Sequence, residues 1–268
     1  MTFYLRATPN PLLLSFVRTL WYYRAPRVAH HRERVLPNGC MQIILNLSRS
    51  YLTGCGEDGT ANRRLPRAIV VGPRARYEVI DTADMEEIVG IVIQPGGFAG
   101  LFRERADLFF ERSIGLEEVS PGMSLTDRLC EVPAPVEKLR TLEVLLTGHL
   151  YPGARRSELV DQAMYLFREK DFSIAECARS VGLSERRLSQ VFREQVGVAP
   201  KMWCRIRRFQ IALRALHNGK DVPWAELALR CGYYDQSHFA NDFRMFSGIN
   251  PTTYSALRGS WQNHVPLL

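Results

Sequence analysis

Residues 175–251 contain one sequence pattern twice, and this duplication constrains the fold more than any other feature of the chain. The first copy reads Ala175-Glu176-Cys177-Ala178, Gly182-Leu183, Phe192-Arg193, Gly197 and Pro200. The second copy reads Ala225-Glu226-Leu227-Ala228, Gly232-Tyr233, Phe243-Arg244, Gly248 and Pro251. Corresponding residues are 50 positions apart before the turn and 51 apart after it. The chain is therefore expected to contain two small units of the same fold.

The ends of the helices in each unit can be located from capping and turn residues. In the first copy, Ser173 and Glu176 have the spacing of a capping box. Gly182 interrupts that helix, and Ser184 is placed to cap the next one. In the second copy, Pro223 begins the first helix, Gly232 turns the chain and Asp235 caps the next helix. Each copy thus predicts a helix-turn-helix unit, whose common use is to place a helix in the major groove of DNA.

The second helix of each unit has a polar face that could read DNA. At about 100° per residue, these faces lie opposite the apolar side chains that each helix buries. They carry Arg186, Ser189, Gln190 and Arg193 in the first unit, and Ser237, His238, Asn241 and Arg244 in the second. Arginine, glutamine, asparagine and serine can all bond to base edges. Arg193 and Arg244 lie further along their helices, where a phosphate contact is expected.

A long helix over residues 202–216 is predicted between the two units. Its basic residues are Lys201, Arg205, Arg207, Arg208 and Arg214. Either they form a solvated polar face, or the helix is a spacer that sets the two reading helices on successive grooves, roughly 34 Å apart. The pattern leaves both interpretations open.

Charge is unevenly distributed between the two halves of the chain. Residues 155–268 have 17 Lys and Arg against 11 Asp and Glu, a net charge of +6, whereas residues 1–154 have 18 against 17, a net charge of +1. A basic half joined to a neutral half is typical of a nucleic-acid-binding domain attached to another domain.

Residues 155–258 resemble the AraC/XylS family of bacterial transcription regulators. The matching motifs are Ile174-Ala175-x-x-Ala178, Gly182-Leu183-Ser184, Leu188-x-x-x-Phe192-Arg193, Gly197-Val198-x-Pro200, Ala228, Gly232-Tyr233, Ser237-x-Phe239-x-x-x-Phe243-Arg244 and Gly248-x-x-Pro251. The resemblance implies two helix-turn-helix subdomains joined by a linker helix, which bind double-stranded promoter DNA and so meet RNA polymerase. It also implies base contacts by Arg186, Ser189 and Gln190 in one helix, and by Gln236, Ser237, His238 and Asn241 in the other.

The N-terminal region is expected to be rich in β-structure. Alternation over residues 41–48 follows the Pro37-Asn38-Gly39 turn, and further strands are predicted at 68–71, 76–80 and 88–93, with a polar loop at 54–62 and a short helix at 98–105. The segments Leu36-Pro37-Asn38-Gly39, Val71-Gly72-Pro73 and Gln94-Pro95-Gly96-Gly97-Phe98 resemble a cupin-like sensor domain. The predicted fold class is α+β: a β-rich barrel or sandwich at 1–118, a helical connector at 119–153, an all-α DNA-binding domain at 154–258 and a tail at 259–268.

Two functions of the N-terminal domain agree with the sequence. It could bind a small-molecule effector, whose binding residues are unknown, or it could only form a homodimer or bind a protein partner. A cavity lined by apolar side chains would favour the first. The connector's apolar stripe, which includes Leu139, Leu142 and Leu146, is either a dimer contact or ordinary packing between domains.

Enzymatic and membrane functions are not expected. The N-terminal domain offers the adjacent pair His30-His31, whose side chains would diverge on a strand, so we expect neither a metal site nor a cofactor. Leu12-Leu13-Leu14 is too short for a signal peptide, and no stretch approaches the roughly 20 apolar residues of a membrane span. We therefore expect a cytoplasmic, non-enzymatic protein.

Overall fold

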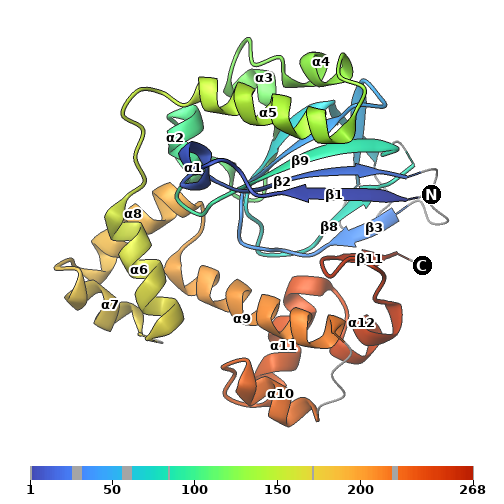
Figure 1. Ribbon diagram of the computed structural model, residues 1–268. Helices are drawn as coiled ribbons and strands as arrows, with labels where there is room; N and C mark the ends of the chain where they lie inside the picture. The colour runs from blue at the N-terminus through green and yellow to red at the C-terminus, as the bar shows by residue number, and fades with distance from the viewer. Residues whose placement is uncertain are drawn as a thin grey trace.

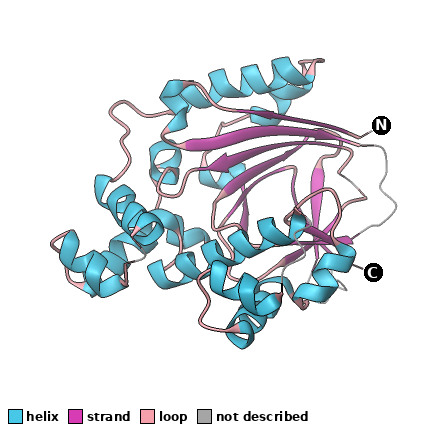
Figure 2. Cartoon of the chain, turned by 60° about the horizontal axis from the view of Figure 1, so that its bottom comes forward, coloured by secondary structure: helices cyan, strands magenta, loops and turns pink. Residues whose placement is uncertain are grey.

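A β-rich N-terminal region is followed by a helical C-terminal region, as the α+β fold class requires (Figure 1). The computed structural model describes residues 2–25, 32–55, 62–83, 85–170, 172–218 and 223–267. Figure 2 shows the strands lying between the helices that follow them in the N-terminal region and the helices of the C-terminal region.

Within the described residues, the strands form two antiparallel sheets. The first contains, in spatial order, β1 (Phe3–Ala7), β2 (Val17–Arg24), β9 (Glu87–Ile93), β4 (Gln42–Asn46), β7 (Ala68–Val71) and β10 (Ser113–Gly115). The second contains β11 (His264–Pro266), β3 (Arg32–Val35), β8 (Glu78–Asp81), β5 (Tyr51–Cys55) and β6 (Asn62–Pro66). The expected strands correspond to β4, β7, β8 and β9. The predicted loop at 54–62 was too long, because its first and last residues belong to β5 and β6.

The outer face of the first sheet is covered by helices. These are α1 (Pro11–Leu14), α2 (Phe98–Phe102), the 3₁₀ helix η1 (Ala106–Phe109), α3 (Leu116–Val119), α4 (Leu125–Cys130) and α5 (Pro135–His149). Residues on alternate positions of β2 face opposite sides, so Leu20 and Tyr22 are buried under the helices. Helix α2 is shorter than predicted because Arg103 adopts a left-handed conformation, with φ of 54°.

The connector belongs to the core of the β-rich region. Leu139, Leu142 and Leu146 of α5 are buried in the same apolar cluster as the outer face of the first sheet. Their stripe is therefore packing, and the alternative of a dimer contact at these side chains is wrong.

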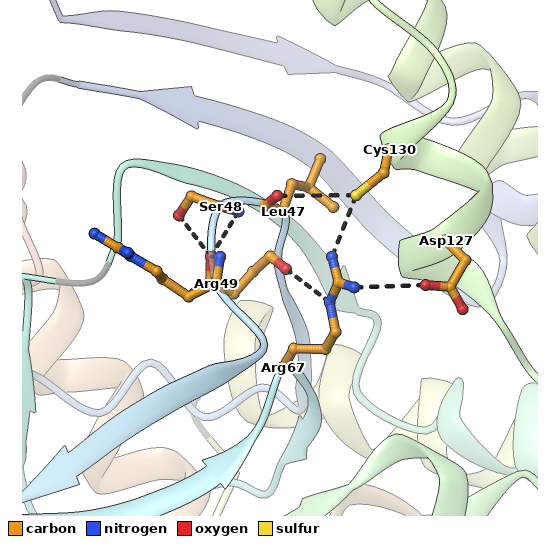
Figure 3. A network of polar contacts seen from close by, with 7 residues as sticks. Leu47, Ser48, Arg49, Arg67, Asp127 and Cys130 are labelled. Carbon is orange, nitrogen blue, oxygen red and sulfur yellow. Dashed lines mark hydrogen bonds and ion pairs between the residues drawn. The ribbon is translucent and has the colours of Figure 1, made fainter.

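Helix α4 is also tied to the strands by polar contacts (Figure 3). The Arg67 guanidinium donates to the Asn46 carbonyl oxygen at 3.3 Å and to Cys130 Sγ at 3.2 Å. The same group lies 3.5 Å from an Asp127 carboxylate oxygen, while the Cys130 thiol faces the Leu47 carbonyl at 3.8 Å. One arginine thus joins the end of β4 to the connector.

The C-terminal region contains the helices that the duplicated pattern predicts. They are α7 (Ile174–Ser180), α8 (Glu185–Val196), α10 (Trp224–Arg230) and α11 (Gln236–Ser247), and the long helix predicted between the units is α9 (Pro200–His217). The region also contains α6 (Glu158–Glu169) and α12 (Pro251–Leu257). The first unit packs around Leu188 and Phe192, and the second around Phe239 and Phe243. Helix α9 passes from one unit to the other (Figure 1).

The two regions share a packed boundary. Leu36, from the loop after β3, is buried in the apolar core of the second unit together with Val265. Residues expected to form a tail instead end in β11, which pairs with β3 so that Val265 lies opposite Arg34. The last strand of the chain therefore anchors the second unit to the β-rich region. No helix of the described residues is long and apolar enough to cross a membrane.

Candidate nucleic-acid interface

The two units have matching turns. Gly182 and Gly232 have positive φ angles of 69° and 79°, as a tight turn between helices requires. The amide of Leu183 donates to the Ala178 carbonyl at 2.9 Å, and the amide of Tyr233 donates to the Ala228 carbonyl at 3.0 Å. The same backbone bond therefore sets the angle between the helices in both units.

Helix α8 exposes the predicted reading face of the first unit. Ser184 caps the helix by accepting from the Arg187 amide at 3.2 Å, and Leu188 and Phe192 are fully buried below it. On the opposite side, Arg186, Gln190 and Arg193 are exposed and Ser189 is half-buried. The Gln190 side-chain amide donates to a Glu194 carboxylate oxygen at 3.0 Å, so a base contact by Gln190 requires it to give up this bond.

The C-terminal half of α8 lies against the β-rich region. Arg193 Nε is 3.7 Å from Asp107 Oδ2 on η1, and Arg105 lies 2.7 Å from that carboxylate and 3.5 Å from Glu194. Hydrogen bonding from Arg105 lowers the pKa of Asp107, so its carboxylate stays ionised. Arg193, a predicted phosphate contact, thus faces a carboxylate of its own chain.

Helix α11 exposes the predicted reading face of the second unit. Asp235 caps it by accepting from the His238 amide at 2.7 Å. Gln236, Ser237, Asn241 and Arg244 are exposed, whereas His238 is half-buried.

His238 is held by neighbours within its own unit. Its ring lies edge-on to Tyr233, with centroids 5.2 Å apart, and its Nε2 is 3.9 Å from Asp242 Oδ2. The Asp242 carboxylate is 3 % exposed and accepts from Arg205 of α9 at 2.7 Å. Sequence reasoning missed Asp242, although its position four residues after His238 on one helix was a usable signal.

Several arginines of α9 brace the two units. Arg205 bonds to Asp242 of the second unit, and Arg207 donates to the Phe167 carbonyl of the first at 3.3 Å. Arg208 donates to the Gly232 carbonyl at 3.1 Å and lies over the Tyr233 ring. Lys201 and Arg214 are exposed. The prediction that the basic residues of this helix form a solvated face is therefore wrong for Arg205, Arg207 and Arg208.

A second candidate site is a cavity of about 1170 Å³. It lies between the facing sides of the two sheets, where Trp21, Ile44 and Leu52 line it, and it extends to Ile206 of α9 and to the C-terminal segment. The apolar core of the first sheet is on the opposite, helix-covered side, which leaves the space between the sheets incompletely filled. The pair His30-His31 lies outside the described residues.

Each of the two regions is similar to a known domain family. Residues 155–256 match a helix-turn-helix domain family, and residues 5–115 match a domain of unknown function (DUF6597). The probable transcriptional regulator LumQ of Photobacterium leiognathi is 27% identical over 96 residues, 36% of this chain and 38% of that protein. The HTH-type transcriptional activator RhaR of Yersinia pseudotuberculosis is 29% identical over 107 residues, 40% of this chain and 37% of that protein. The chain thus matches less than two fifths of the length of these relatives.

Two solved structures are also similar to the chain, one over most of its length and the other over a smaller part. ToxT of Vibrio cholerae aligns with 96% of this chain and 97% of its own, at 10% identity and a TM-score of 0.48. The DNA-binding domain of AdpA, a global transcriptional factor in complex with a target DNA, aligns with 37% of this chain and 92% of its own, at 27% identity and a TM-score of 0.35.

Proposed function

We propose that the chain is a transcription regulator of the AraC type that reads a specific promoter sequence in two adjacent major grooves, because residues 155–256 match a helix-turn-helix domain family. The observation that carries the proposal is the pair of equivalent turns, which present α8 and α11 with polar, exposed outer faces. The matched relatives are named as a probable transcriptional regulator and a transcriptional activator, which supports this function over an enzymatic one. The same proposal includes RNA polymerase as a partner of the chain and the cytoplasm as its location.

Replacing Arg186 by Ala is expected to weaken DNA binding by about 1–3 kcal/mol and to relax the preference at one base position, because Arg186 lies near the start of α8 and is exposed.

Replacing Arg193 by Ala is expected to weaken binding to every DNA sequence alike. It is also expected to lower the slope of log affinity against log salt concentration by about 1. Duplexes selected from a random library by the full chain supply the DNA, and titrations at several salt concentrations give both values. Unchanged affinity and salt response in both variants would contradict the assigned faces.

The β-rich domain is proposed to bind a small-molecule effector. The cavity between the sheets supports this, because it combines apolar walls with polar groups such as Gln42 and is large enough for a metabolite. The rival function, a domain that only dimerises or binds a protein, would be favoured by a filled core.

A thermal-shift screen of the full chain against small metabolites tests the effector proposal. We expect at least one compound to raise the melting temperature, and we expect Ile44→Trp to reduce that rise because the larger side chain on β4 would take up part of the cavity. If no compound changes the melting temperature and the protein is a homodimer in solution, the result would favour a domain that only dimerises or binds a protein.

A further inference from the structure

The last residues of the chain form a strap between the second helix-turn-helix unit and the β-rich region. We define this C-terminal strap as residues 259–267. It leaves α12, where the Tyr254 hydroxyl donates to the Gln262 carbonyl at 2.8 Å, and reaches β3, where the Leu36 amide donates to the Asn263 carbonyl at 2.8 Å. The strap ends with the Leu267 amide donating to the Arg32 carbonyl at 2.9 Å.

Trp261 of the strap occupies a site made by aromatic side chains of the first sheet. Its ring centroid lies 4.4 Å from that of Tyr4 and 6.3 Å from that of Tyr23, in edge-on or tilted contact. Tyr4 stacks in turn on Trp21 at 6.4 Å. All four rings line the cavity, and we call the site formed by Tyr4, Trp21 and Tyr23 the aromatic slot.

The slot has a fixed floor. The Trp21 indole lies directly on the backbone of Gly90 in the neighbouring strand β9, which leaves no room for a Cβ at that position. Tyr4 is on the edge strand β1 and is 40% exposed, so one side of the slot opens toward solvent. Flat, rigid aromatic walls with an open side suit a planar aromatic group, since such rings gain from stacked and edge-to-face contacts.

The strap also contacts the linker helix next to the slot. The Gln210 side-chain amide of α9 donates to the Pro37 carbonyl at 2.7 Å and to Asn263 Oδ1 at 3.0 Å. Gln262 donates to Gln210 Oε1 at 3.2 Å. A movement of the strap therefore breaks the bonds from Gln210 to Asn263 and Gln262, which help to fix α9 against the β-rich region, whereas the bond from Gln210 to Pro37 does not involve the strap.

We infer that the aromatic slot binds a planar aromatic molecule. The Trp261 side chain fills the slot when no ligand is present, and the ligand displaces it. Displacement detaches the C-terminal strap from β3 and loosens the second helix-turn-helix unit, which then keeps its contacts at Leu36 and Pro37 with the loop after β3. The regulatory half of this inference rests on the proposed function, because the loosened unit is the proposed DNA reader. The binding half does not depend on DNA.

Free indole is the probe for the slot, and Trp261→Ala is the variant that empties it. We expect indole at about five times its dissociation constant to raise the melting temperature of Trp261→Ala by about 2–4 °C more than that of the wild type. Trp224→Ala is the matched control, because Trp224 is also a half-buried tryptophan but packs on Phe239 of the second unit, away from the slot. An equal shift in both variants, or none in Trp261→Ala, overturns the binding half.

Hydrogen exchange in the wild-type chain tests displacement without depending on how well Trp261→Ala folds. Saturating indole is expected to speed exchange at the Leu267 amide, which bonds to Arg32, and to leave the Tyr233 amide of the second unit unchanged. Tyr4→Ala alters an exposed edge residue and removes one wall of the slot, so it is expected to abolish the response. Exchange at Leu267 that does not change with indole, or a response that persists in Tyr4→Ala, overturns the inference.

Footprints on selected duplexes separate this inference from the proposed function. With indole, protection by α11 is expected to change while protection by α8 remains. Failure of the chain to select any DNA sequence would reject the proposed function and leave the indole results standing. Footprints identical with and without indole would reject the regulatory half alone.

Discussion

Arg205→Ala is expected to lower the free energy of unfolding of the C-terminal region by about 3 kcal/mol, because it leaves the buried Asp242 carboxylate without its cation. Arg205 also lies over the Phe246 ring and bonds to Met245 Sδ, so its loss removes packing on α11 as well. Urea denaturation monitored by circular dichroism measures the change. Arg214→Ala is the matched control, since Arg214 is an exposed arginine of the same helix, and it should change stability by less than about 0.5 kcal/mol.

The same substitution should also impair recognition by the second unit. Arg205 fixes α11 on α9 through Asp242, and Asp242 lies beside His238 on the reading face. Footprinting of Arg205→Ala on a selected duplex is expected to show weaker protection in the half-site of α11 than in that of α8. Equal stability of the two arginine variants would mean that the ion pair contributes nothing net to the fold.

The helices of the C-terminal region could be predicted from the sequence because their signals are local. Ser173, Ser184 and Asp235 each accept the hydrogen bond from a helix amide that their spacing predicts. Gly182 and Gly232 turn the chain where expected. A cap or a turn depends on residues within one helical turn, so one sequence suffices to find it.

The β-rich region was predicted less completely because its strands depend on distant partners. The three-residue strand β11 is too short to show alternation, and it pairs with a strand more than 200 residues earlier in the chain. The inner face of β2 carries Trp21 and Tyr23 toward a cavity, so both of its faces are rich in large apolar side chains and the alternation is weak. The sequence therefore predicts only a tail at 259–268, and its patterns do not indicate β1, β2, β5, β6 or β10.

The residues of the reading faces could be named from periodicity, but their surroundings could not. Exposure of Arg186 and Asn241 follows from which residues of each helix are apolar. The approach of Asp107 to Arg193 could not be inferred, because it depends on how the β-rich region packs on α8. Whether these side chains contact bases remains a prediction, which the Arg186 and Arg193 variants test.

Gly197→Ala is expected to lower the free energy of unfolding through two effects, strain at residue 197 itself and a clash with the β-rich region. Gly197 ends α8 with φ of 91°, and a Cβ there would lie 2.6 Å from Pro73 Cγ and 3.2 Å from the Ala106 carbonyl oxygen. Left-handed strain of about 1–2 kcal/mol then adds to an overpacking cost of about 1–3 kcal/mol. Gly182→Ala is the matched control, because Gly182 has a similar φ of 69° but nothing within 4 Å of the added methyl group.

Thermal and urea denaturation of the two glycine variants therefore separate strain from the contact between regions. Gly182→Ala should lose about 1–2 kcal/mol, and Gly197→Ala about 2–5 kcal/mol, with the difference due to Pro73 and Ala106. Because the same contact holds Arg193 beside Asp107, Gly197→Ala should also raise the affinity of the first unit for DNA when measured at a temperature where the chain is folded. Equal losses in the two variants would show that α8 does not pack on η1 in solution, and Arg193 would then be available to phosphate without any movement of the β-rich region.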